Sequence, residues 1–131
     1  MNWYKIAKES TIEVYHGTNN SLDRFDQSQQ RSGYYPGFYA SSLKENALTF
    51  GDNIYRFILQ PSKYYEINNE HDSKILKEIA SKNGYHVSMG SGFGESQYLK
   101  DIGYHGINRG IEYIVFEPEK NLGEVEENEL V

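Results

Sequence analysis

Three short segments place a reactive or aromatic side chain at the start or end of an expected β-strand. His16 follows the alternating pattern of residues 12–15 and precedes a glycine. Tyr39 lies in an apolar run that leads into an expected helix, and Glu112 begins the most apolar strand. With the two-residue period of a strand, Glu112 shares a face with Ile114 and Phe116. A carboxylate on an apolar face is unfavourable unless it is paired or used, so Glu112 is a candidate catalytic residue.

Other sites with a simple sequence pattern are not supported. The four histidines (16, 71, 86 and 105) have no HExxH spacing and form no cluster with carboxylates that is typical of a metal site. The chain has no cysteine, which excludes thiolate metal sites, disulfides and a cysteine nucleophile. The glycines of residues 90–94 lack the lysine and hydroxyl residue of a nucleotide P-loop, so we interpret this segment as a flexible loop.

Together, the three segments resemble the His-Tyr-Glu class of ADP-ribosyltransferases, the fold of diphtheria-type toxins and poly(ADP-ribose) polymerases. In that family one strand ends in His-Gly-Thr/Ser, a second reads Gly-x-Tyr-Phe-Ala/Thr/Ser, and a late strand reads Glu-Tyr-Ile/Val-Val-Tyr/Phe-Asp. The counterparts here are His16-Gly17-Thr18, Gly37-Phe38-Tyr39-Ala40-Ser41 and Glu112-Tyr113-Ile114-Val115-Phe116-Glu117. The resemblance spans residues 12–120 and indicates a toxin-like bacterial or phage effector.

The resemblance implies a role for each matched residue. NAD is the expected substrate and cofactor, with its nicotinamide on the backbone of Gly17 beside Thr18 and its ring between Tyr39 and Phe50. His16 is expected to bind the adenosine-side ribose. Glu112 is expected to bind the 2′-hydroxyl of the nicotinamide ribose and to stabilise the positive charge that develops as the glycosidic bond breaks. The implied function is mono-ADP-ribosyltransferase activity on a macromolecular acceptor, without a metal. The expected acceptor is a protein.

Departures from the family pattern leave other functions open. Ala40 stands where the family has an aromatic residue, and Ala47 where the polymerases have a serine that binds nicotinamide. A catalytically degenerate module that binds NAD or a protein, and an NAD glycohydrolase, are therefore the alternatives. A metal-independent nuclease using His16 and Glu112, and a purely structural module, are further alternatives. Gly110, two residues before Glu112, disfavours arginine as the acceptor, because arginine-specific relatives have Glu or Gln there.

The elements around these residues predict an α+β fold. We expect strands over residues 12–18, 37–41, 53–60 and 63–67 and a hairpin of residues 106–108 and 111–117. Helices are expected over residues 43–50, 73–83 and 95–102, where apolar residues have helical spacing and glycine follows. The resemblance implies that the strands form split antiparallel sheets. We expect one domain over residues 1–120 and an acidic tail over residues 121–131.

Charge and hydropathy limit the partners. The net charge is −6, and most of it falls between Glu117 and Val131, where six glutamates face one lysine. Because the basic residues are scattered, a nucleic-acid partner is unsupported. The chain has no apolar stretch near the roughly 20 residues that span a bilayer, and residues 1–5 lack the apolar core of a signal peptide. We therefore expect a cytoplasmic protein without a membrane partner, with delivery into another cell left open.

Overall fold

The computed structural model describes residues 11–19, 35–88 and 91–124. Its strands are β1 (Ile12–Thr18), β2 (Phe38–Ser41), β3 (Asn53–Leu59), β4 (Tyr64–Glu66), β5 (Gly106–Arg109), β6 (Glu112–Val115) and β7 (Gly123–Glu124). Its helices are α2 (Lys44–Leu48), α3 (Glu70–Lys82), α4 (Phe93–Asp101) and α5 (Pro118–Asn121), with a 3-10 turn η1 at Pro61–Lys63. The expected α+β class is confirmed.

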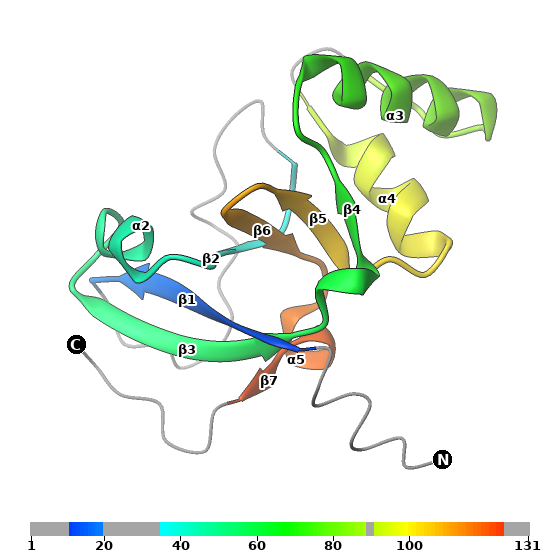
Figure 1. The fold of residues 1–131 in the computed structure, drawn as a ribbon. Helices are drawn as coiled ribbons and strands as arrows, with labels where there is room; N and C mark the ends of the chain where they lie inside the picture. Colours follow the sequence, from blue (N-terminus) through cyan, green and yellow to red (C-terminus); the bar gives the residue numbers. More distant parts are fainter. Residues whose placement is uncertain (1–10, 20–34, 89–90, 125–131) are drawn as a thin grey trace.

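The strands form a mixed seven-stranded sheet in the order β4-β5-β6-β2-β1-β3-β7 (Figure 1). The pairing of β4 with β5 is parallel, and the other pairings between the named strands are antiparallel. The resemblance implied purely antiparallel sheets, and the parallel pair of β4 and β5 departs from that expectation. A parallel neighbour requires a long crossover, and the segment that holds α3 and α4 supplies it between β4 and β5.

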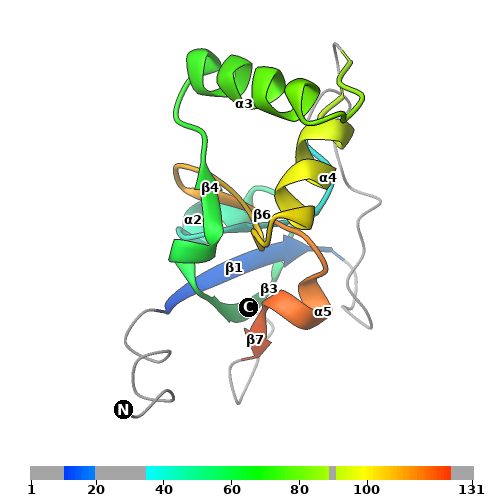
Figure 2. The ribbon, with the colours of Figure 1, turned by 90° about the vertical axis from the view of Figure 1, so that its right-hand side faces the viewer.

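Each face of the sheet carries its own apolar core. On one face, α3 and α4 contribute Leu76 and Leu99, which pack on Ile107 and Ile114 of the hairpin strands. On the other face, Val14, Phe38 and Phe57 pack together, and Leu122 from the segment after α5 joins them. Figures 1 and 2 show α3 and α4 side by side over the β4–β5–β6 side of the sheet, with α5 and β7 at the opposite side. Burial on both faces explains why residues 113–115 of β6 form an uninterrupted apolar run.

Helix α3 begins earlier than the expected start near Asp72. Asn69 is the N-cap residue, and its side chain accepts a hydrogen bond of 2.9 Å from the Asp72 backbone N–H. The Asp72 carboxylate in turn accepts a bond of 2.9 Å from the backbone N–H of Asn68. The Asn69 cap satisfies an N–H group that the first helical turn leaves unpaired, and the Asp72 carboxylate holds the backbone just before the helix. The sequence pattern located the helix correctly, and side-chain geometry decided its first residue.

The folded body continues past residue 120, where we expected the acidic tail to begin. Leu122 is 8% exposed and belongs to a core, and β7 pairs with β3 through Phe57–Glu124 and Ile58–Gly123. The sequence also predicts a short N-terminal helix and core positions for Leu22 and Phe25. These segments, and residues 125–131 of the tail, lie outside the described residues. Among the helices that are described, none has the length and apolar character needed to cross a bilayer.

Candidate functional site

The sheet opens between β1 and β2. These strands are in register at the pair Tyr15–Ser41, whereas β1 pairs with β3 along its whole length, from Ile12–Leu59 to Thr18–Asn53. On its other side, β2 pairs with β6 from Phe38–Val115 to Ser41–Glu112. The two halves of the sheet therefore part beyond Tyr15, where an unbroken antiparallel ladder would set Gly17 opposite Tyr39.

His16 lies at this opening. Its Nδ1 donates a hydrogen bond of 2.6 Å to the backbone oxygen of Tyr39, and its ring stacks on Phe38 with centroids 4.1 Å apart. The side chain is buried, at 8% exposure. Because a carbonyl oxygen only accepts, the proton is assigned to Nδ1, and in the neutral ring Nε2 is then an acceptor. The imidazole thus replaces a strand–strand bond at the position where β1 and β2 separate.

Tyr39 is held from both ends. Its backbone oxygen accepts the bond from His16, and its hydroxyl donates a bond of 2.6 Å to the backbone oxygen of Tyr35. The side chain is partly buried and packs against the core under α3 and α4. These contacts fix the ring on the face of β2 that also carries Ser41.

Glu112 lies on the same face of the sheet as Tyr39. It is opposite Ser41 of β2 and opposite Arg109 of β5, and it is half-buried. The backbone N–H of Ser42 donates a bond of 2.8 Å to the oxygen of Ile111, which fastens the hairpin turn to the end of β2. Tyr39 and Glu112 are diagonal neighbours on adjacent strands, within reach of one bound ligand.

The structure gives Gly17 a packing role that the sequence analysis did not consider. A Cβ atom at this position would lie 1.9 Å from the backbone oxygen of Ala47 in α2 and 3.3 Å from Cδ1 of Ile54. Glycine is therefore required for α2 to pack on the end of β1. Ala47 stands where the polymerases have a serine that binds nicotinamide. In this structure it is 2% exposed, and its backbone oxygen forms the contact with Gly17.

Thr18 and Phe50 complete the group of predicted binding residues. Thr18 is buried at 4% exposure, and a Cβ atom on Gly51 would lie 2.1 Å from its carbonyl carbon. Phe50 follows α2 and remains 38% exposed, with its N–H donating to the oxygen of Ala47 at 3.0 Å. An accessible aromatic ring next to the buried end of β1 is suited to stacking on a planar ligand.

Of the three predicted catalytic residues, His16 and Glu112 each lie near Tyr39 but on opposite faces of the sheet. His16 and Tyr39 are in contact, and Tyr39 and Glu112 share a face of neighbouring strands. By strand register, however, the His16 side chain projects with Val14 and Phe57 toward the other face of the sheet. A ligand that contacts both the imidazole and Glu112 must therefore lie in the opening between β1 and β2.

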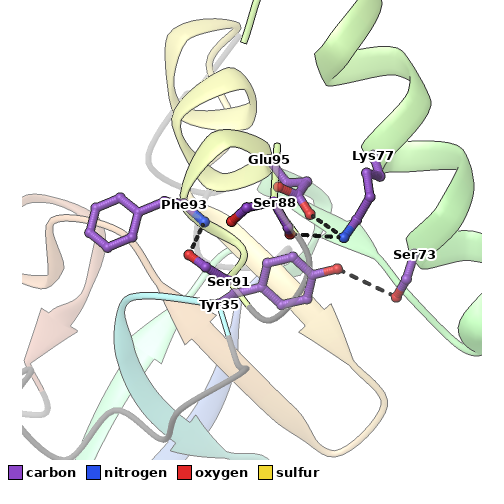
Figure 3. Close-up of polar contacts among 7 residues, drawn as sticks. All are labelled: Tyr35, Ser73, Lys77, Ser88, Ser91, Phe93 and Glu95. Atoms are coloured by element: carbon purple, nitrogen blue, oxygen red, sulfur yellow. Dashed lines mark hydrogen bonds and ion pairs between the residues drawn. The ribbon is translucent and has the colours of Figure 1, made fainter. Parts of the chain in front are cut away.

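An ion pair between the half-exposed Lys77 of α3 and the buried Glu95 of α4 was not predicted. Glu95 is 1% exposed, and its Oε2 lies 3.7 Å from Nζ of Lys77, which also donates to the Ser88 oxygen at 3.2 Å (Figure 3). Its Oε1 is buried without a hydrogen-bond partner in the described structure. The pair fastens the glycine-rich segment to α3, and no periodic pattern marks it, because the two residues meet only through packing of the helices.

The same segment is more closely packed than a flexible loop. The Tyr35 ring lies against Gly92, where a Cβ would be 2.2 Å from Cδ1, and the His86 oxygen lies against Gly94 at 2.0 Å from a Cβ. Ser88 and Ser91 form a β-bridge. These glycines therefore serve close packing, although residues 89–90 lie outside the described ranges. Across residues 11–19, 35–88 and 91–124, no group of three His, Cys, Asp or Glu side chains is placed to hold a metal ion.

Comparisons with known proteins do not place the chain in a family. No model of a protein family matches it, and no curated protein does. A similar solved structure, described as "Crystal structure of an anti-CRISPR protein", is 15% identical with a TM-score of 0.47 and covers 92% of this chain and 96% of that chain.

Proposed function

We propose that this protein is a mono-ADP-ribosyltransferase that cleaves NAD and transfers ADP-ribose to a macromolecular acceptor. The observation that carries the proposal is the contact between His16 and Tyr39 at the opening of the sheet, with Glu112 on the face of Tyr39. The three motifs were selected from the sequence for this chemistry, and they meet at adjacent strands although they are distant in the chain.

The opening between β1 and β2 is the expected position of the nicotinamide. There the ligand reaches the backbone beyond Tyr15, where β2 is no longer in register with β1. The exposed ring of Phe50 and the fixed ring of Tyr39 are the stacking partners available to it. Stacking contributes on the order of 1 kcal/mol per contact beyond the area that it buries.

Glu112 supplies the charge in this mechanism. As the bond between C1′ of the ribose and N1 of nicotinamide breaks, its electron pair leaves with nicotinamide, and the ribose carries positive charge. The Glu112 carboxylate binds the 2′-hydroxyl and stabilises that charge. A nucleophile of the acceptor then bonds to C1′ and loses its proton. His16 is the residue expected to bind the adenosine-side ribose, and the bond from its Nδ1 to the Tyr39 oxygen orients the ring.

Two measurements test the proposal. The first is the release of nicotinamide from NAD by the purified full chain. The second is the intact mass of proteins that have been incubated with the chain and NAD. Nicotinamide release together with an ADP-ribose adduct supports transferase activity. Nicotinamide and free ADP-ribose without an adduct indicate an NAD glycohydrolase. NAD binding by calorimetry without nicotinamide release indicates a binding module of the same fold, and overturns the transferase proposal.

A further inference from the structure

A cavity of about 260 Å³ lies between α4 and the segment that follows β6. Phe93, Gln97 and Lys100 line it from α4, and Phe116 and Glu117 line it from the other side. Its volume is just below the range of about 300–1,000 Å³ that is typical of sites for drug-sized ligands. The cavity is therefore suited to a single ring system rather than to an extended ligand.

This cavity is separate from the candidate site. Phe116 lies four positions after Glu112 along one extended segment, so the two are about 13 Å apart at the rise of a strand. Ile114 between them is fully buried in the core under α4. One ring cannot occupy both places.

The cavity offers aromatic surface. Phe93 is 67% exposed, and its ring points away from the polar cluster of Glu95 and Lys77 (Figure 3). Its backbone N–H donates to Oγ of Ser91 at 3.3 Å, which fixes the start of α4. Phe116, at 5% exposure, forms a buried part of the lining. An exposed ring on a fixed backbone at the cavity is a stacking platform for a planar ligand.

Polar groups with unused hydrogen-bonding capacity accompany these rings. Nε2 of Gln97 donates to Oδ1 of Asp101 at 2.8 Å, which orients the amide and leaves it a carbonyl oxygen and a second N–H. An amide with both functions matches the edge of a nucleobase. Ser96 also lines the cavity, and its buried hydroxyl has no hydrogen-bond partner in the part of the chain that is described.

Charge and backbone conformation add two constraints. Lys100, Glu117 and Glu119 are the charged residues of the lining. Glu117 is paired, because it lies 4.0 Å from Nζ of Lys100 and 3.9 Å from Nζ of Lys120, which lies outside the lining. The two carboxylates disfavour an anion, and the ion pairs of Glu117 leave little charge for a cation, so a neutral ligand fits best. Glu117 also has a left-handed backbone conformation, with a φ of 47°. Among the described residues it is the non-glycine residue with a positive φ. Strained positions of this kind concentrate at ligand sites.

We propose that this cavity binds a neutral, nucleobase-sized heteroaromatic ring, stacked on Phe93 and read by the Gln97 amide. The ring belongs either to a free nucleoside or to the adenosine half of a dinucleotide. The inference does not depend on the proposed transferase activity, because neither Glu112 nor His16 lines the cavity.

Calorimetric titration of the full chain with adenosine tests the inference. We expect binding that weakens by about tenfold or more in Phe93→Ala, because stacking of a base is worth about 1–3 kcal/mol, and that also weakens in Gln97→Ala. Ile102→Ala, which removes an apolar side chain 53% exposed just after α4, is the matched control and should bind adenosine as the unmodified chain does. Thermal unfolding of each variant verifies that it is folded.

Parallel titrations distinguish the two sources of the ring. If Phe93→Ala weakens binding of NAD but not of nicotinamide mononucleotide, which lacks adenine, the adenosine half of a dinucleotide occupies the cavity. If it weakens adenosine alone, the ligand is a free nucleoside. The inference is overturned if adenosine does not bind, or if Phe93→Ala binds adenosine as tightly as the unmodified chain does. It is also overturned if the cation Nα-acetylargininamide binds and adenosine does not. Nicotinamide release, measured separately, reports on the transferase proposal alone.

Discussion

The Nδ1–H group of His16 donates to the backbone oxygen of Tyr39 across 2.6 Å, at the place where β1 and β2 separate. The bond joins the two halves of the sheet through a side chain instead of a backbone ladder. It also orients the imidazole and places the proton of the neutral ring on Nδ1. The structural contact and the proposed binding role thus involve the same side chain.

Replacement of Glu112 by glutamine tests the catalytic carboxylate. The change removes the charge and preserves the shape, so nicotinamide release should fall by roughly 100- to 1,000-fold, as it does when one group that stabilises a transition state is lost. Because Glu112 is half-buried at the end of a strand, the thermal midpoint should change little.

Glu66→Gln is the matched control, since Glu66 is an exposed glutamate at the end of β4. Its nicotinamide release should equal that of the unmodified protein. Equal rates in Glu112→Gln and Glu66→Gln would remove Glu112 from the mechanism.

Replacement of His16 by alanine should lower both stability and NAD affinity. The variant removes the hydrogen bond to the Tyr39 oxygen and the ring stacked on Phe38, and loss of a buried hydrogen bond costs about 1–3 kcal/mol. Urea unfolding and calorimetric titration with NAD measure the two effects. His71→Ala, at an exposed position of α3, should leave both unchanged. Undiminished NAD affinity in a folded His16→Ala protein would contradict the binding role.

Replacement of Gly17 by alanine tests the packing of α2 on β1. The new Cβ would lie 1.9 Å from the Ala47 oxygen, so α2 must shift, and overpacking of this kind costs about 1–3 kcal/mol. Gly123→Ala is the control, because its Cβ would meet Ile58 at an ordinary 3.7 Å. Denaturant unfolding compares the two. Equal free energies of unfolding of the two variants would show that α2 can shift away from β1 without loss of stability.

Stability should depend on pH through His105. Burial, followed by the charges of Lys63 and Lys120, lowers the pKa of this imidazole below its ordinary value of 6.5, and its buried Nδ1 has no hydrogen-bond partner in the described structure. As the pH falls below about 6.5, the unfolded chain binds a proton that the folded protein resists. The free energy of unfolding should therefore decrease from that point down to the folded-state pKa.

Urea unfolding at a series of pH values measures this effect. In His105→Gln, which cannot titrate, the decrease between pH 6.5 and 5 should be smaller than in the unmodified protein. An identical pH dependence in the two proteins would exclude His105 as its source.

Local patterns predicted most of the secondary structure. The strand expected over residues 53–60 and the helical spacing of Ile75, Leu76 and Ile79 correspond to β3 and α3, because short segments of this kind are marked by the burial of nearby residues. The termini of the helices were less predictable. The start of α3 depends on the side chains of Asn69 and Asp72, which accept hydrogen bonds from the backbone N–H groups of Asp72 and Asn68.

The sequence by itself determined the α+β class and identified the three motifs around His16, Tyr39 and Glu112, since residue type and short-range period suffice for both. Only the tertiary structure decided that β4 pairs in parallel with β5, that β1 and β2 part beyond Tyr15, and that Gly17 makes room for α2. These features depend on contacts between segments far apart in the chain. Their energies come from packing and from strand register, which no local pattern of residues encodes.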